Sequence, residues 1–340
     1  MDITENVSLK DYSTMRLGGS ASYLTSVRSE LELINALNYA TSNNIQALVI
    51  GKGSNILWRD QGFAGLVIIN RIRGLEIKDG GDSVDFRIGA GEDWDAVVEK
   101  SVSLGLSGIE CLSSIPGTAG ATPIQNVGAY GQEIKDVLIS VEAIDILQKA
   151  KVFLNNSECD FSYRNSVFRK NQGRYFITFI NLRLSKKISL KTPFYKDLEN
   201  YFMQNNISNY TPAIVREAVI DIRKQKLPNP KDYYNLGSFF KNPIITKVLF
   251  EKLKMNYPDI KGWESPSGIK ISAAWLIDQA GFNNYHDPKS GMATWKNNPL
   301  ILVNELAKST LDVITFRDLI INHVREMFGI ELEQEPLLLP

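Results

Sequence analysis

The chain has 340 residues, and its 38 lysine and arginine residues are balanced by 38 aspartate and glutamate residues. This neutral balance excludes a protein that binds nucleic acid through bulk positive charge, and the length allows two or three domains. Hydrophobic residues make up 44% and charged residues 22% of the sequence, which excludes a disordered chain and indicates a folded globular protein.

Residues 1–73 are predicted to form a small α+β subdomain. Ser29 and Glu32 have the spacing of a helix capping box, and the apolar residues after them predict a helix that ends near residue 43. Apolar runs at residues 47–50 and 66–69 predict two strands, one before and one after a loop with two glycines. This order of elements indicates a subdomain that ends around residue 73.

Strand patterns dominate the next segment, residues 74–227. The sequence predicts strands at residues 84–88, 141–147 and 175–180, and helices at residues 93–104 and 211–226. Gly105 has the position of a helix C-terminus, and Thr211 before Pro212 is typical of a helix start. Pro228 and Pro230 then indicate a domain boundary.

Residues 228–329 form a third predicted domain, which is mainly helical. Its helices are predicted at residues 246–254, 270–280 and 315–328, the last beginning at Thr315 and ending at Gly329. Short strand candidates lie between the helices.

The tail, residues 330–340, begins with alternating apolar and acidic residues, which predicts a strand. Glu331, Glu333 and Glu335 share one face of that strand, so spacing alone does not choose among them as functional carboxylates. An exposed acidic edge is the alternative for all three. Because Pro336 favours an extended residue before it, we take Glu335 as the first candidate and Glu333 as the second.

Membrane, secretion and metal signals are absent from the sequence. No apolar run approaches the roughly 18 residues of a membrane helix, and the acidic N-terminus is unlike a signal peptide, so we expect a cytoplasmic protein. Cysteine and histidine occur only at Cys111, Cys159, His286 and His323, so we expect no metal site. This scarcity of histidine predicts proton transfer by Ser, Tyr, Lys or a carboxylic acid.

Two loops have the composition of a phosphate-binding site. The first glycine loop, residues 51–55, reads Gly-Lys-Gly-Ser-Asn after a predicted strand. A Rossmann domain is disfavoured, because Ile56 replaces the third glycine and no acidic residue stands about 20 positions later. The second glycine loop, residues 114–131, contains small and polar residues and two prolines. Its length favours a ligand-binding role over a loop that only connects two elements.

Positive charge is concentrated between Arg223 and Lys241. This segment has five basic residues (Arg223, Lys224, Lys226, Lys231 and Lys241) and one acidic residue, Asp232. A solvated helix end explains Lys224 and Lys226, but not Lys241, so the segment favours a diphosphate-binding role.

In combination, the motifs resemble the flavin-dependent UDP-N-acetylenolpyruvoylglucosamine reductases (UDP-N-acetylmuramate dehydrogenases) of peptidoglycan synthesis. The matching segments are residues 13–19, both glycine loops, residues 163–168, residues 226–228, residues 237–243 and the glutamate-bearing tail. The resemblance implies an α+β protein with a vanillyl-alcohol-oxidase-like (PCMH-type) two-part FAD-binding fold, residues 1–73 and 74–227. It also implies a substrate domain, residues 228–329, and a C-terminal strand, residues 330–340, that carries the catalytic glutamate.

The resemblance implies a reaction in which NADPH reduces non-covalently bound FAD, which then reduces UDP-N-acetylglucosamine enolpyruvate to UDP-N-acetylmuramate. Ser238 matches the general acid that protonates the substrate, and Arg164 matches the arginine that binds its carboxylate. Glu335 matches the glutamate that completes this trio. The implied partners are these two substrates, without nucleic acid or membrane, and the implied state is a monomer.

Further site residues follow from the same resemblance. The implied cofactor contacts are Gly51, Lys52, Gly53, Ser54, Asn55, Ile115, Pro116, Gly117, Thr118, Gly120, Ala121 and Gln125. The implied substrate contacts are Tyr130, Tyr195, Lys226 and Asn242, with Tyr195 on a loop that closes over the nucleotide. The sequence departs from the commonest family pattern at Lys52, where glycine is frequent, at Ala121 and at Pro336.

Other interpretations stay open from the residues alone. Arg164 suits bidentate capture of a carboxylate but also suits a structural ion pair, and Ser238 after Gly237 is typical of a turn. An FAD-linked oxidase of the same fold is one alternative function, although neither histidine lies near the glycine loops in sequence. A non-catalytic UDP-sugar-binding protein is the other.

Overall fold

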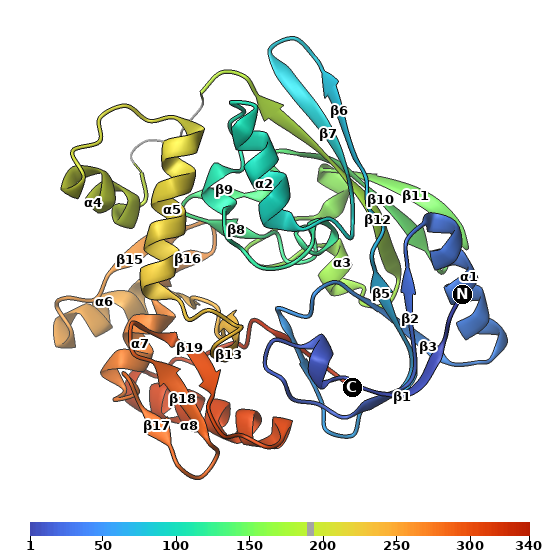
Figure 1. The fold of residues 1–340 in the computed structure, drawn as a ribbon. Coiled ribbons are helices and arrows are strands. Elements are labelled where there is room, and N and C mark those ends of the chain that lie inside the picture. Colours follow the sequence, from blue (N-terminus) through green and yellow to red (C-terminus); the bar gives the residue numbers. More distant parts are fainter. Residues whose placement is uncertain (189–193) are drawn as a thin grey trace. The chain divides into compact units, whose positions relative to one another are not determined.

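The structure is a computed structural model that describes residues 1–188 and 194–340 (Figure 1). The chain divides into two compact units. The first unit contains residues 1–7, 21–52 and 63–224, and the second contains residues 8–20, 53–62 and 225–340. The division falls inside the first glycine loop, between Lys52 and Gly53.

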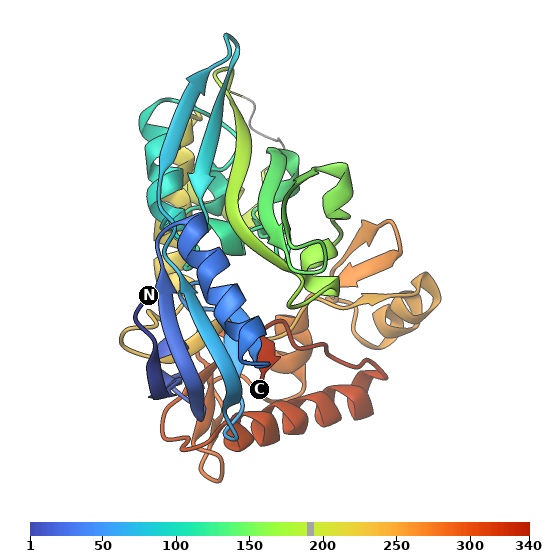
Figure 2. The ribbon, with the colours of Figure 1, turned by 90° about the vertical axis from the view of Figure 1, so that its right-hand side faces the viewer.

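One sheet of the first unit has the strand order β1-β2-β5-β3. Its strands are β1 (Thr4–Ser8), β2 (Ser20–Val27), β3 (Gln46–Ile50) and β5 (Phe63–Asn70), and β5 runs parallel to both β2 and β3. The helix α1 (Glu30–Ser42) lies along this sheet and buries Leu33 and Leu37 against Leu66 (Figure 2). The predicted helix and both predicted strands are therefore confirmed.

The N-terminus of α1 differs in detail from the predicted capping box. Ser29 accepts a hydrogen bond from the N–H of Glu32, as expected. The Glu32 carboxylate, however, accepts from the N–H of Arg28 at 2.6 Å, one residue before the expected partner.

The second sheet of the first unit is five-stranded, with the order β11-β10-β12-β7-β6. Its antiparallel strands are β6 (Leu75–Asp79), β7 (Ser83–Gly89), β10 (Leu138–Asp145), β11 (Ala150–Asn155) and β12 (Tyr175–Ser185). The strands predicted at 84–88 and 175–180 lie within β7 and β12, and the strand predicted at 141–147 overlaps β10, which ends at Asp145. The edge strands β6 and β11 were not predicted.

Four further α-helices lie in the described part of the first unit. They are α2 (Trp94–Ser103), α3 (Val167–Lys170), α4 (Lys196–Gln204) and α5 (Pro212–Lys226), the last of which ends just past the unit boundary. Asp93 caps α2 by accepting from the N–H of Ala96, and Gly105 after the helix has a φ of 70°. The predicted helices at 93–104 and 211–226 are thus confirmed.

Besides the two-stranded pairing of the tail described below, the second unit holds two small sheets and three α-helices around one apolar core. Its sheets have the orders β13-β19-β18-β17 and β14-β16-β15. The strands are β13 (Tyr234–Ser238), β14 (Ile244–Ile245), β15 (Gly262–Ser265), β16 (Gly268–Ile271), β17 (His286–Asp287), β18 (Met292–Trp295) and β19 (Asn298–Asn304). The helices are α6 (Lys247–Asn256), α7 (Ala273–Gln279) and α8 (Thr310–Phe328).

Two predicted helix starts in this unit were wrong. The helix predicted from residue 270 begins at Ala273, because the residues before Ser272 belong to β16 and Ser272 caps α7. The helix predicted from Thr315 begins at Thr310, because Ser309 and Asp312 form a capping box.

The tail forms less strand than its alternation predicts. Gln334 makes one isolated bridge to Phe240, and the regular strand is β20 (Leu337–Leu339), which runs parallel to β4 (Ile56–Trp58). Throughout the described ranges, no helix combines the length and apolar character that crossing a membrane requires.

Candidate active site

Gly51 lies directly against the second glycine loop within the first unit. A Cβ atom at position 51 would collide with the Thr118 side chain, so this close approach requires glycine. The Thr118 segment is in turn fixed to the chain before α2, because the N–H of Trp94 donates to the Gly117 carbonyl at 3.3 Å. The backbone of the first loop at Gly51 therefore packs against the Thr118 side chain of the second loop, which brings the two loops together as a diphosphate-binding site needs.

Lys52 and Asp93 form an ion pair beside this contact. Asp93 also caps α2 and makes an isolated bridge with Thr118, so it touches both sides of the loop contact. Burial opposes ionisation of Asp93, but the Lys52 ammonium and the Ala96 N–H outweigh it and lower the pKa of the carboxyl. Sequence reasoning did not single out Asp93, although its position before Trp94 is typical of a helix cap.

The remaining residues of the first glycine loop belong to the second unit. Gly53 is buried with a φ of 70°, and the Tyr12 carbonyl occupies the place where a Cβ atom would lie. The Gly53 carbonyl accepts from the N–H of Thr14, and the Asn55 carbonyl accepts from the N–H of Leu337. Ser54 and Asn55 are half-buried in a loop held by the N-terminal segment and the C-terminal strand.

The second glycine loop is tied to the segment that carries Arg164. The Arg169 guanidinium donates to the side-chain oxygen of Gln125 at 3.3 Å, and the Ser166 hydroxyl donates to the Ile124 carbonyl at 2.6 Å. Asn126, which is buried, donates to the Ser162 carbonyl. Residues 162–169 and the loop thus form one hydrogen-bonded structure, and sequence reasoning missed Asn126 and Arg169 as its supports.

Arg164 is half-buried and sits in an uncommon backbone conformation. Its φ is 53°, its guanidinium donates to the Gly128 carbonyl at 3.2 Å, and it lies 5.3 Å from the Tyr163 ring centroid. A non-glycine residue with positive φ costs conformational energy, which the surrounding structure must offset. The side chain is thereby held toward the β8–β9 hairpin, β8 (Gly128–Ala129) and β9 (Gln132–Glu133).

Tyr130 and Tyr195, both implied substrate contacts, lie together in the first unit. Their rings make an edge-to-face contact with centroids 5.9 Å apart. Burial raises the pKa of Tyr130 to about 12, so its phenol stays protonated and neutral at physiological pH. Tyr195 keeps 48% of its surface exposed, which leaves it accessible to a ligand.

In the second unit, Ser238 ends β13 and lies on a chain segment that pairs with the tail. The N–H of Glu335 donates to the Phe239 carbonyl, and the N–H of Lys241 donates to the Glu333 carbonyl, both at 2.9 Å. Gly237, just before Ser238, has a φ of 72°.

Burial distinguishes the three tail glutamates. Glu335 is buried, with 8% of its surface exposed, whereas Glu331 and Glu333 are exposed. Glu333 pairs with the Lys241 ammonium. Lys241 therefore has an acidic partner, so its cluster beside Ser238 is less positive than the sequence suggested.

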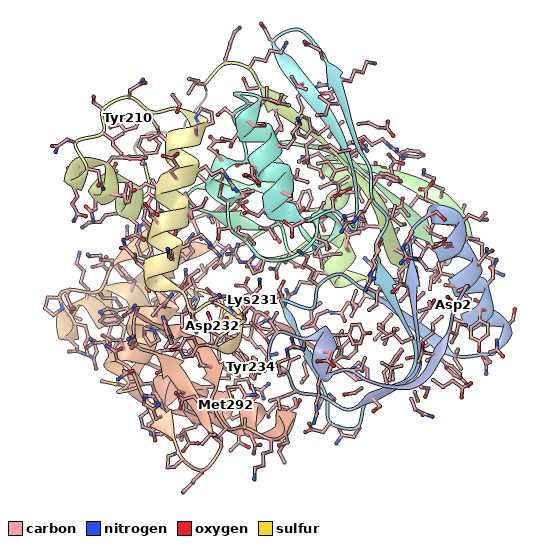
Figure 3. The ribbon with its side chains drawn as sticks, in the orientation of Figure 1. Asp2, Tyr210, Lys231, Asp232, Tyr234 and Met292 are labelled. Carbon is pink, nitrogen blue, oxygen red and sulfur yellow. The ribbon has the colours of Figure 1, made fainter. Side chains whose placement is uncertain are left out.

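The two other implied substrate contacts also lie in the second unit. The side-chain oxygen of Asn242 accepts from the N–H of Ala273 at 2.9 Å, which fixes Asn242 to the first residue of α7. Lys226 is exposed at the end of α5. Lys231 and Asp232 follow in the loop that leads to Tyr234 in β13 (Figure 3).

Both histidines belong to the second unit. His286 pairs with Glu305, and His323 on α8 contacts the Phe282 ring. In the part of the chain that the structure describes, no group of three His, Cys, Asp or Glu residues is arranged to hold a metal ion.

Known proteins match the chain along most of its length. A family model of an FAD binding domain matches residues 21–149, and a model of the C-terminal domain of UDP-N-acetylenolpyruvoylglucosamine reductase matches residues 229–339. The chain is 37% identical over 341 residues to the UDP-N-acetylenolpyruvoylglucosamine reductase of Pseudomonas aeruginosa, covering 99% of both. It is 36% identical over 332 residues to that of Escherichia coli, covering 97% of the chain and 95% of the relative.

The fold is similar to a crystal structure of UDP-N-acetylenolpyruvylglucosamine reductase from Thermus caldophilus. The two share 24% identity with a TM-score of 0.69, and the match covers 100% of both chains. With the FAD binding domain model, this likeness confirms the predicted α+β fold with a PCMH-type FAD-binding part.

Proposed function

The chain belongs to the UDP-N-acetylenolpyruvoylglucosamine reductase family, and we propose that Arg164, Ser238 and Glu335 are its catalytic residues. It is an FAD-dependent oxidoreductase that reduces UDP-N-acetylglucosamine enolpyruvate to UDP-N-acetylmuramate with NADPH, in peptidoglycan precursor synthesis. When bound, FAD supplies the hydride-transfer chemistry between NADPH and the enolpyruvyl group.

The residues of both glycine loops fit the FAD diphosphate. Gly51 lies so close to the Thr118 side chain that a Cβ atom would collide with it, and backbone N–H groups of such loops are good donors to a diphosphate. The cofactor contacts in this proposal are Gly51, Lys52, Gly53, Ser54, Asn55, Ile115, Pro116, Gly117, Thr118, Gly120, Ala121 and Gln125. Arg169 supports this set by fixing Gln125.

Each catalytic residue has a role that its chemistry suits. Arg164 binds the enolpyruvyl carboxylate, because its planar guanidinium can donate two parallel hydrogen bonds. Ser238 donates the proton that the substrate receives at C2. Glu335 stabilises the charge that develops on the substrate in the transition state, together with Arg164. The backbone pairing of residues 239–241 with residues 333–335 and the burial of Glu335 support the assignments of Ser238 and Glu335.

The UDP-sugar contacts are Tyr130, Tyr195, Lys226 and Asn242 in this proposal. The edge-to-face contact of Tyr130 with Tyr195 supports a shared role, and the exposed ring of Tyr195 suits a lid over the nucleotide. The proposed domains are residues 1–73 and 74–227 for FAD, and residues 228–329 with the tail 330–340 for the substrate.

The protein is further proposed to act as a monomer in the cytoplasm, without a nucleic-acid or membrane partner. The balance of 38 basic and 38 acidic residues supports the absence of a nucleic-acid partner. Sedimentation of the purified protein tests the oligomeric state.

An anaerobic assay of the purified protein tests the function. NADPH should bleach the flavin, and NADPH oxidation should continue only when the enolpyruvyl sugar is added. Oxygen consumption in place of enolpyruvyl reduction would identify an oxidase, and UDP-sugar binding without NADPH oxidation would identify a non-catalytic binding protein. Release of the flavin on denaturation tests its non-covalent attachment.

A further inference from the structure

The ion pair of Lys52 with Asp93 joins two segments of the FAD-binding part that are distant in sequence. Lys52 follows Gly51 in the first glycine loop, and Asp93 precedes α2. Asp93 also bridges Thr118, and Ala119 of the same loop donates its N–H to the Glu92 carbonyl at 2.9 Å. The ion pair therefore lies where the two glycine loops meet.

We infer that Lys52 and Asp93 are positioning residues whose ion pair holds the two glycine loops together and so strengthens FAD binding. Lys52 then acts on the cofactor through Asp93 and the loop backbone, rather than as a direct ligand of the diphosphate. This inference rests on the proposed FAD site. It refines the assignment of Lys52 as a cofactor contact.

The surroundings of Asp93 support this role over direct contact. Its carboxylate is fixed by the N–H of Ala96 at 3.0 Å, so the Lys52 ammonium is drawn to a charge that the helix start holds in place. A lysine that is already paired with a carboxylate offers little net charge to a phosphate. Gly51, next to Lys52, packs closely against Thr118. The Lys52–Asp93 ion pair, one residue away, opposes separation of the two glycine loops at this contact.

The two roles predict opposite effects of removing the Asp93 charge. If Lys52 positions the loops, Asp93→Asn weakens FAD binding, because the link between the loops is lost. If Lys52 instead binds the diphosphate directly, Asp93→Asn leaves binding unchanged or tightens it, because the ammonium is released and a negative charge is removed. Asn also caps helices well, so α2 keeps its N-terminal hydrogen bond.

The test is the FAD dissociation constant of the full-length holoenzyme, measured from the recovery of flavin fluorescence on dilution. Lys52→Gln and Asp93→Asn should each weaken FAD binding about three- to fivefold, the size expected for an exposed ion pair. The double variant should be no weaker than either single variant, and Lys52→Arg should restore the wild-type value. Unchanged or tighter binding by Asp93→Asn, or additive effects in the double variant, would overturn the inference.

A second ion pair of the first unit provides the control. Lys186 pairs with Asp79 at 2.7 Å, also links distant segments, and is exposed to a similar degree. Lys186→Gln and Asp79→Asn should leave the FAD dissociation constant unchanged; an equal weakening would show a general effect of lost charge pairs and overturn the inference. Failure of the wild-type protein to bind FAD would instead refute the proposed cofactor site.

Discussion

The backbone N–H of Glu335 donates a hydrogen bond of 2.9 Å to the carbonyl of Phe239, the residue that follows Ser238. The proposed acid and the proposed glutamate therefore lie on paired segments of one compact unit, although they are far apart in the sequence. The same pairing leaves Glu333 exposed and bound to Lys241, so the chain offers two neighbouring glutamates in different environments.

Glu335→Gln should lower turnover of the enolpyruvyl sugar about 10²- to 10³-fold, because a group that stabilises the transition state is lost. Glu333→Gln is the matched control, since it removes only an exposed partner of Lys241 and should change turnover less than about threefold. Steady-state kcat of the two variants checks the assignment. Equal losses in both variants, or a larger loss for Glu333→Gln, would contradict it.

Ser238→Ala should separate the two halves of the reaction. Flavin bleaching by NADPH should keep its wild-type rate, while turnover of the enolpyruvyl sugar should fall about 10²- to 10⁴-fold, as for loss of a general acid. Stopped-flow absorbance measures the first step, and product formation measures the second. Slowed bleaching would refute the assignment of Ser238 to the second step alone.

Arg164→Lys should lower kcat/KM for the enolpyruvyl sugar about 10- to 100-fold, because lysine cannot donate the two parallel hydrogen bonds of a guanidinium. Arg183→Lys is the control, because the exposed Arg183 side chain donates two hydrogen bonds to the Asp85 carboxylate. Arg183→Lys should leave kcat/KM unchanged. A normal kcat/KM in Arg164→Lys would show that Arg164 is structural.

Buried, periodic elements were predictable from the sequence, because their apolar side chains repeat with the period of the element. The strand predicted at 175–180 is mostly buried within β12, whereas β6 is almost wholly exposed and gave no apolar signal. The start of α8 was misplaced because Thr315 resembles a cap. In the fold its hydroxyl donates to the Leu311 carbonyl inside the helix, and Ser309 is the true cap.

Composition located the loops of the site, but not the contacts between them. The ion pair of Lys52 with Asp93 depends on how the chain returns beside the first glycine loop, which spacing does not encode. The alternation of the tail likewise did not distinguish Glu331, Glu333 and Glu335 as candidate catalytic carboxylates. In the fold, burial distinguishes Glu335 from the other two.

Glu142 is a buried carboxylate in the five-stranded sheet, and its charge stabilises the fold. Arg87 donates to it at 2.6 and 2.9 Å, and Lys151 lies 2.9 Å away. Burial alone would raise the pKa of Glu142, but these cations and Asn181 outweigh it and hold the pKa at about 2. Because this pKa is below the ordinary value of 4.5, the carboxylate stabilises the fold above pH 4.5, and this contribution is lost as the pH falls toward 2.

Glu142→Gln should therefore lower the free energy of unfolding at neutral pH by about 2–3 kcal/mol, and the variant should lose less further stability than the wild type between pH 4.5 and 2. Glu76→Gln is the control, because Glu76 binds the same Arg87 at 2.8 Å but its side chain is 71% exposed, so we expect a loss under about 1 kcal/mol. Urea unfolding across this pH range measures both. If the stability of Glu142→Gln fell in parallel with that of the wild type as the pH was lowered, another carboxyl would have to account for the acid sensitivity.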